Sequence, residues 1–199
     1  MAGQEAWQRM LSGRRLNLLD PSPFDIEIDD IAQGLSKVAR WNGQTSGPHA
    51  FSVAQHCLLV LELLDQEAGP YPRPIRLGAL LHDAAEYVIG DLISPFKRAI
   101  NLDYKAFEGQ ILGAIRLRFG LDAQPSKAER HAVKRADSQA AYLEATQLAG
   151  FDRAEAAKLF MPPSQHIDLE PLPASKAKAA FLQSFAHLTS ARAPHSNSL

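Results

Sequence analysis

Cysteine is nearly absent from this sequence of 199 residues. Its single thiol, Cys57, has no partner for an intrachain disulfide and cannot by itself build a thiolate zinc site. Such low cysteine usage is typical of a reducing compartment, and a metal in this chain would need nitrogen and oxygen ligands. The sequence therefore excludes a small secreted scaffold stapled by disulfides.

Long hydrophobic runs are missing as well. The apolar stretch that begins at Cys57 meets Glu62 after only five residues, far short of the roughly 18 apolar residues that span a bilayer. The first residues, Met1–Glu5, lack the basic head and apolar stretch of a signal peptide. We therefore expect a cytoplasmic protein that makes no contact with a membrane.

The chain has no excess of charge of either sign. Its 21 Lys and Arg residues against 22 Asp and Glu residues give a net charge of -1. This balance provides no global attraction to a nucleic acid polymer, so an anionic ligand would have to be held by local groups. The length and the hydrophobic share of 46% predict one globular domain over residues 1–199, with a core at about 29–150, C-terminal helices at 151–189 and a frayed tail at 190–199.

Strand signals are scarce, whereas apolar residues recur at helical spacing, so we predict an all-α fold. A capping box at Ser52 and Gln55 marks one helix start. Helices are predicted from Asp29 or Asp30 to about Val38, Val53 to about Asp65, Pro74 to Val88, Leu102 to Phe119, Ser126 to Ala149, Arg153 to Phe160 and Ser175 to Leu188.

Several ionisable residues fall on faces that these helices should bury. His82 and Asp83 lie in an apolar helix, with Glu86 on the same face one turn after His82. His56 lies on the apolar face of the preceding helix, and Asp137 lies on the inward side of a later one. Because ionisable groups are costly to bury unless they are paired or bound to metal, we expect these residues to converge on one ion.

Two imidazoles and two carboxylates form a nitrogen and oxygen donor set. Such a set suits one divalent transition metal, Mn, Fe, Co, Ni or Zn. It would leave coordination positions for a water and a phosphate oxygen, so that the ion polarises the phosphoryl group and lowers the pKa of the attacking water. This donor set therefore favours hydrolysis of a phosphate ester.

The order of His56, His82-Asp83 and Asp137 resembles the H…HD…D signature of the HD-domain phosphohydrolases, which are all-helical and metal-dependent. The resemblance covers roughly residues 31–144, and it is closest to the bacterial 5'-deoxynucleotidase group. The flanking pieces that carry this closer likeness are Arg40-Trp41, Gly90-Asp91-Leu92, Ser94-Pro95 and Lys97.

The resemblance implies a role for each matched residue, within a single helical HD-type domain that holds its metal between helices. It implies metal ligation by His56, His82, Asp83 and Asp137, proton handling by Glu86, phosphate contacts from Arg40 and Lys97, a wall near the sugar 2' position from Trp41, and a bond to the sugar 3'-hydroxyl from Asp91. Taken singly, each residue also has a structural reading, such as an ion pair for Arg40, core packing for Trp41 or a turn for Asp91. The resemblance also implies a homodimer.

This chain departs from the group's pattern along the segment from Arg40 to His56, which contains Gly43, Gly47 and Pro48, and at the residue before the first His. The group commonly has Glu immediately before its first His, where this chain has Gln55, so a carboxylate that would orient the ligand is missing there.

We expect a small-molecule nucleotide substrate, a deoxynucleoside 5'-monophosphate. Two alternatives stay open: an HD-type deoxynucleoside triphosphate triphosphohydrolase, which would need more cations than Arg40, Lys97 and Arg98, and a nonhydrolytic nucleotide-binding regulatory module.

Overall fold

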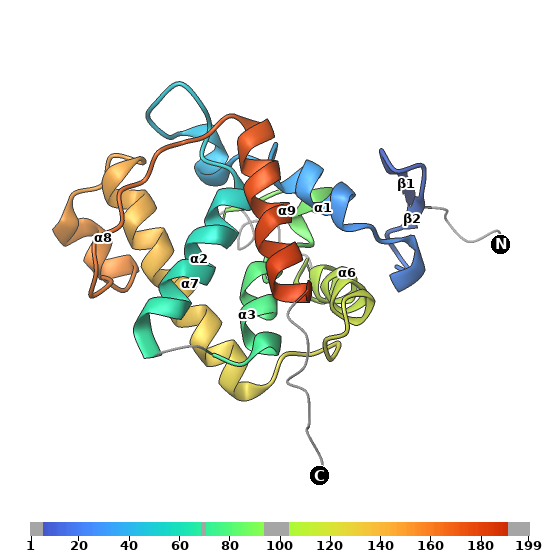
Figure 1. Ribbon diagram of the computed structural model, residues 1–199. Coiled ribbons are helices and arrows are strands. Elements are labelled where there is room, and N and C mark those ends of the chain that lie inside the picture. The colour runs from blue at the N-terminus through green and yellow to red at the C-terminus, as the bar shows by residue number, and fades with distance from the viewer. Residues whose placement is uncertain (1–5, 69–70, 94–103, 191–199) are drawn as a thin grey trace, which may run out of the picture.

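A bundle of helices forms most of the molecule (Figure 1). The computed structural model describes residues 6–68, 71–93 and 104–190. Its helices are α1 (Ile28–Leu35), α2 (Val53–Ala68), α3 (Arg73–Leu80), α4 (Glu86–Ile89), α6 (Tyr104–Arg118), α7 (Lys127–Gln147), α8 (Arg153–Leu159) and α9 (Ala174–Ser190), with short 3-10 turns η1 (Pro23–Asp25) and η2 (Arg40–Gly43).

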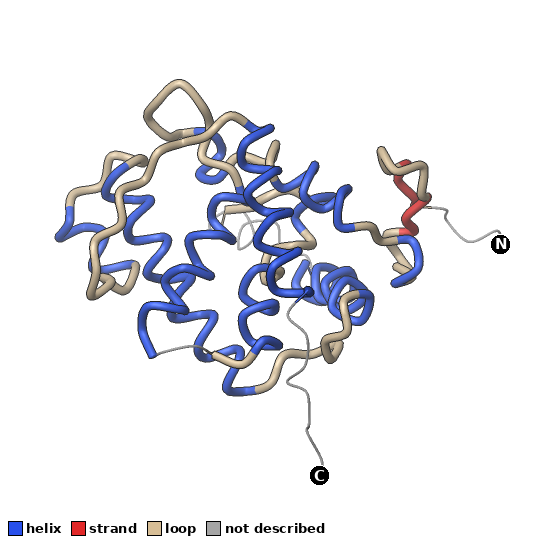
Figure 2. The backbone as a smooth tube through the Cα atoms, viewed as in Figure 1, coloured by secondary structure: helices blue, strands red, loops and turns tan. Residues whose placement is uncertain are grey.

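The chain is mostly helical, as the periodicity predicts (Figure 2). One short antiparallel hairpin, which the sequence did not indicate, precedes the helices and pairs β1 (Trp7–Arg9) with β2 (Arg15–Asn17). No helix in the described part of the chain is long and apolar enough to span a bilayer. The predicted frayed tail lies almost wholly outside the described residues.

Helix α2 stands between two apolar clusters and contributes to both. Its residues Val53, Ala54 and Cys57 join the first cluster, with α1, α3, α6 and α9, while Val60 and Leu63 join the second, with α7. A helix covered on both sides buries polar residues together with its apolar ones. This explains why His56 is fully buried.

The predicted helix from Pro74 to Val88 is interrupted. Helix α3 ends at Leu80, and α4 begins at Glu86 after a turn over residues 81–85. In this turn the amides of Ala84 and Glu86 donate to carbonyls three residues back, at 3.0 Å each, which tightens the chain relative to an α-helix. The continuous helix was therefore wrong, and the His82-Asp83 pair lies in a turn rather than on a helix face.

The start and the end of helix α1 differ from the prediction. Helix α1 begins at Ile28, so Asp29 and Asp30 lie in its first turn instead of capping it, and it ends before Val38. The carboxylate of Asp30 accepts hydrogen bonds from the amide and hydroxyl of Ser12, at 2.9 and 2.5 Å, and so holds the hairpin against α1.

At the start of α2 the capping box is only half formed. The Ser52 hydroxyl accepts from the amide of Gln55 at 3.3 Å, as predicted. The Gln55 side chain, however, donates to the carbonyl of Glu170 at 2.9 Å and accepts from the amide of Leu172 at 3.0 Å. Its predicted capping role is therefore wrong, because a distant segment offers the amide both a donor and an acceptor.

Candidate metal centre

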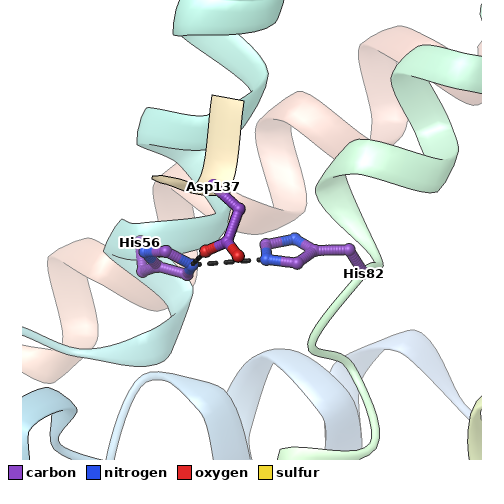
Figure 3. Close-up of side chains that lie close together, drawn as sticks. All are labelled: His56, His82 and Asp137. Carbon is purple, nitrogen blue, oxygen red and sulfur yellow. Dashed lines mark hydrogen bonds and ion pairs between the residues drawn. The ribbon is translucent and has the colours of Figure 1, made fainter. Parts of the chain in front are cut away.

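Three of the residues singled out from the sequence meet at one point, although they come from three different segments (Figure 3). His56 comes from α2, His82 from the turn after α3, and Asp137 from α7. One donor atom from each lies within 4.8 Å of the others. The Nε2 atom of His56 is 3.3 Å from Nε2 of His82 and 3.2 Å from Oδ1 of Asp137.

The fourth predicted ligand lies at the same place. Oδ2 of Asp83 is 3.3 Å from Nε2 of His82 and 3.5 Å from Nε2 of His56. The turn over residues 81–85 thus points two consecutive side chains toward α2, which a regular helix would separate by about 100° around its axis. The structure therefore brings all four predicted ligands together.

The far side of each imidazole is already hydrogen-bonded. Nδ1 of His82 lies 2.8 Å from the carbonyl oxygen of Ala79, which can only accept, so this nitrogen carries a proton. Nδ1 of His56 lies 2.6 Å from Oε1 of Glu144, a carboxylate that likewise accepts. With Nδ1 protonated on both rings, the two Nε2 atoms are left to face the cluster, as they do in histidines that bind metal.

The spacing of the two imidazole nitrogens fits a single ion. If two nitrogens 3.3 Å apart each lie at the usual distance of about 2.1 Å from one ion, they subtend about 100° at it. This angle falls between the values of an octahedral and a tetrahedral site. Nitrogen and carboxylate donors together suit Mn, Fe, Co, Ni or Zn, so the residues present fit the predicted cofactor.

The site's charges shift the pKa values of its own groups. Burial opposes protonation of His82, but Asp83 outweighs it and raises the pKa of His82 well above its ordinary value. Burial and Arg40 likewise oppose a rise at His56, yet Glu144 and Asp137 raise its pKa. Burial would raise the pKa of Asp83, and the two histidines lower it instead. The neighbouring carboxylates therefore favour the imidazolium form of both rings, and a cation at the cluster would compete with these protons.

The sequence reasoning missed Glu144. Its side chain is fully buried, and its carboxylate accepts from Nε of Arg40 at 3.2 Å and from Nε1 of Trp41 at 2.8 Å, besides its bond to His56. Burial alone would raise the pKa of Glu144, but Arg40 and His56 lower it to about 2. A signal was present in the sequence, because Glu144 follows Asp137 by two helical turns on α7 and so shares its face.

Arg40 and Asp91 are also brought together. Nη1 of Arg40 lies 3.2 Å from Oδ2 of Asp91, and Arg40 is only 14% exposed. Gly90, with φ of 76° and ψ of 163°, takes a backbone conformation that essentially only glycine adopts, and it ends α4 just before Asp91. Burial would lower the pKa of Arg40, but Glu144 and Asp91 raise it, so the guanidinium stays charged.

Trp41 stands in η2 in a strained backbone conformation. Its φ of 57° and the 51° of Asn42 lie in the left-handed region, which is costly for residues with a side chain. Its ring packs against Phe151 and Phe160, with ring centres 5.6 and 5.9 Å away. These contacts and the bond to Glu144 fix the ring, and both phenylalanines lie beyond the segment that the resemblance covers.

The structure describes two of the three remaining residues, Glu86 and Cys57, and both are buried. Glu86 is the first residue of α4 and only 3% exposed. Lys97 lies outside the described residues. Cys57, next to His56 in the sequence, is fully buried, and burial raises the pKa of its thiol, so it packs as an apolar side chain.

A pocket of about 280 Å³ adjoins the cluster. His82 and Asp137 form part of its wall, together with the apolar side chains of Leu112 and Val133. The Asp137 side chain is 42% exposed, so the cluster is open on this side. The volume lies just below the roughly 300–1,000 Å³ that small-molecule sites occupy.

The fold and the site together define a mostly helical protein with a histidine and aspartate cluster suited to a divalent ion. No protein-family model matches the chain. The chain is 54% identical to an uncharacterized protein of Rhodobacter capsulatus over 160 residues, which cover 80% of this chain and 82% of that protein. It is 39% identical to the uncharacterized protein YfdR of Escherichia coli over 108 residues, 54% of this chain and 55% of YfdR. The chain belongs to the family of the Rhodobacter capsulatus protein.

Proposed function

We propose that this protein is a metal-dependent phosphohydrolase of the HD-domain type, and that it converts deoxynucleoside 5'-monophosphates to nucleoside and phosphate. One observation carries the proposal. Nε2 of His56 lies within 3.5 Å of Nε2 of His82 and of one carboxylate oxygen each of Asp83 and Asp137, while Nδ1 of each imidazole donates to an acceptor behind it. Such an inward-facing donor set repels itself unless protons or a cation lie within it.

His56, His82, Asp83 and Asp137 would hold the ion. A divalent ion held there would polarise a phosphate oxygen and lower the pKa of water, as metal ions do in other hydrolases. Asp137 is the most exposed of the four side chains, at 42%. Asp137 therefore lies where the cluster opens, beside the pocket that it helps to line.

The other residues act on the substrate. Arg40 gives one donor to Glu144 and one to Asp91, and its guanidinium keeps further N–H groups for a phosphate. Asp91 would accept a hydrogen bond from the sugar 3'-hydroxyl. Glu86, buried at the start of α4, would take a proton from the attacking water and give one to the leaving 5'-oxygen. Trp41, fixed next to Arg40, would exclude a 2'-hydroxyl by its bulk.

A metal-by-substrate screen tests the proposal. The protein is first freed of metal by chelation and then assayed for phosphate release with Mn²⁺, Co²⁺, Zn²⁺ or Ni²⁺, on matched deoxynucleoside mono- and triphosphates. We expect release of phosphate from the monophosphates, only with an added ion. Release of triphosphate from the triphosphates instead would favour the triphosphohydrolase alternative, and no turnover with any ion would favour a binding module.

Asp137→Ala supplies the specific control, since it removes one charged ligand at the open side of the cluster. We expect this variant to lose activity and to bind metal more weakly by more than the roughly 10- to 100-fold that substitution of an outer orienting group costs. His131→Ala, an exposed change on the same helix, should leave both unchanged. Full activity after exhaustive chelation, or unaltered metal binding by Asp137→Ala, would refute the metal assignment.

A further inference from the structure

A single carboxylate joins the two halves of the candidate site. Oε1 of Glu144 accepts from Nδ1 of His56 at 2.6 Å, on the metal side. Oε2 accepts from Nε of Arg40 at 3.2 Å and from Nε1 of Trp41 at 2.8 Å, on the substrate side. The side chain has no exposed surface, so no water stands in for any of these contacts. Each carboxylate oxygen of Glu144 therefore serves a different part of the site: Oε1 contacts His56, and Oε2 contacts Arg40 and Trp41.

Glu144 also supplies the charge that the sequence lacks beside His56. Gln55 cannot supply it, because its amide is neutral and both of its polar atoms are bonded to the backbone of Glu170 and Leu172. In this chain the carboxylate that orients the first histidine thus comes from α7, 88 residues after His56. The same helix carries the ligand Asp137, so one rigid element fixes both.

We propose that Glu144 is a positioning residue that couples the metal site to the contacts with the substrate. It holds His56 with Nε2 turned toward the ion, and through the same group it sets the orientation of Arg40 and Trp41. This inference rests on the proposed function, because it takes the cluster to be a metal site and Arg40 and Trp41 to be substrate contacts. Glu144 itself touches neither the metal nor the substrate.

The arrangement requires an acceptor on both sides. A glutamine at this position would offer one carbonyl oxygen and one NH₂ group, whereas the site presents N–H donors to both carboxylate oxygens. With its NH₂ toward Arg40 and Trp41, the amide would face two donors. With its NH₂ toward His56, Nδ1 could accept only if its proton moved to Nε2, the atom that faces the cluster. An aspartate keeps two acceptor oxygens and the charge, but it is one methylene shorter. Glu144→Gln and Glu144→Asp therefore separate the role of charge from that of reach.

The first experiment measures metal binding without turnover. Binding of Mn²⁺ to chelator-treated protein is followed by equilibrium dialysis for wild type, Glu144→Gln and Glu144→Asp. We expect Glu144→Gln to bind Mn²⁺ about 10- to 100-fold more weakly, the range that orienting groups behind metal-bound histidines show. Glu144→Asp should recover part of the loss. An affinity of Glu144→Gln within twofold of wild type would overturn the proposal.

The second experiment addresses the coupling itself. With saturating Mn²⁺ present, Glu144→Gln should still raise KM for a deoxynucleoside 5'-monophosphate about tenfold or more, because Arg40 and Trp41 lose their shared acceptor. A KM equal to that of wild type under these conditions would mean that Glu144 serves the metal alone. The coupling would then be wrong even if the first experiment succeeded.

A spectroscopic readout distinguishes positioning from general support of the fold. In the ¹⁵N spectrum of the diamagnetic Zn²⁺ form, wild-type His56 should show a protonated Nδ1 and a metal-shifted Nε2. In Glu144→Gln the Nδ1–H signal should move or exchange faster with water, since its charged acceptor is gone. An unchanged His56 signal would count against the proposal.

Glu67→Gln is the matched control. Glu67 is likewise a carboxylate between α2 and α7, where it pairs with Arg135 and accepts from Gln139, but it lies about 16 Å along α2 from His56. It should lower the melting temperature without changing Mn²⁺ affinity, KM or the His56 spectrum. If wild type itself binds no divalent ion, the proposed function fails; if wild type binds and turns over while the Glu144 variants match it, only this inference fails.

Discussion

At the scale of single residues, the candidate site is held together by groups that each serve more than one partner. Glu144 bonds three side chains, and Arg40 bonds two carboxylates. Trp41 keeps a left-handed backbone that only its surroundings stabilise. Strain of this kind persists where packing and hydrogen bonds fix a conformation. Phe151 and Phe160 pack against the Trp41 ring, and Glu144 accepts its hydrogen bond. Such residues are expected to respond sharply to small changes.

Glu86 should be needed for turnover but not for metal binding. It is buried at the start of α4, directly after the turn with His82 and Asp83. If it transfers protons, Glu86→Gln should keep the fold and the bound metal while kcat falls about 100-fold or more. Metal content and kcat are measured on the same preparation. A variant that loses its metal together with its activity would make Glu86 a ligand or an orienting group.

Trp41 should set the preference for deoxyribose. If Arg40 holds the 5'-phosphate, the adjacent ring excludes a 2'-hydroxyl by shape, and removing it should relax that exclusion. We expect wild type to prefer dAMP to AMP, and Trp41→Ala to narrow the ratio of their kcat/KM values about tenfold, mainly through faster reaction of AMP.

The chain's second tryptophan provides the comparison. Trp7 in β1 is 45% exposed and stacks with Arg15, outside the site, so Trp7→Ala should leave the ratio unchanged. Equal loss of both activities in Trp41→Ala, or no deoxy preference in wild type, would make Trp41 a packing residue.

At the scale of helices and turns, close backbone packing positions α4. A Cβ atom added at Gly34 in α1 would lie 2.7 Å from the carbonyl oxygen of Tyr87 and 2.9 Å from its Cα. Because these are backbone atoms, they cannot rotate away as the end of a flexible side chain would. The position of α4, and of Glu86 at its first residue, therefore depends on the absence of a side chain in α1.

Two glycine substitutions should accordingly have opposite effects. Helix propensity alone favours alanine over glycine by about 1 kcal/mol, and Gly109→Ala in α6, where the added methyl group meets nothing within 4 Å, should gain about 0.5–1 kcal/mol. Gly34→Ala should instead lose about 1–3 kcal/mol through overpacking and lower kcat by moving Glu86. Urea unfolding measures both. Equal stabilisation by the two variants would show that α1 and α4 are not tightly packed.

The periodicity of apolar residues predicts whole helices well. For α7, residues 126–149 are predicted and Lys127–Gln147 observed, with Ser126 as the N-cap. It cannot predict the break at residues 81–85, because Leu77 and Leu81 continue the apolar spacing while the backbone changes to tighter hydrogen bonds. The strands of the hairpin, three residues each, are too short to show an alternation.

The clustering of His56, His82, Asp83 and Asp137 was predictable because these residue types are unusual on buried faces. The hydrogen-bond partners behind these residues could not be predicted from the sequence. Whether Glu144 bonds His56, or Gln55 bonds the segment at Glu170, depends on the packing of segments about 90 to 115 residues apart, which spacing along one helix does not encode.

At the scale of the whole molecule, charge is balanced overall but not at the site. The net charge of the chain is -1. The carboxylates that gather around Arg40 and the two imidazoles are those of Asp83, Asp91, Asp137 and Glu144. With neutral imidazoles this cluster carries a surplus of negative charge in a partly buried place, where charge is poorly screened. Two protons on the histidines and one divalent cation would each offset two units of this negative charge.

Metal binding should therefore release protons and weaken as the pH falls. Because the neighbouring carboxylates raise the pKa values of His56 and His82, the metal-free protein keeps its imidazolium protons to higher pH than an ordinary histidine does. The ion needs both Nε2 atoms without a proton, so its affinity rises with pH until both are free. We expect up to about two protons released per Mn²⁺ near neutral pH, and a Kd that rises about 10- to 100-fold for each unit of acidification below the pKa values.

Calorimetry in buffers of different ionisation enthalpy counts the protons that Mn²⁺ binding releases. His131→Ala, which removes an exposed histidine of α7, should give the same proton count as wild type. A Kd for Mn²⁺ that stays constant between about pH 6 and 8, with no proton release, would mean that the two imidazoles do not bind the ion.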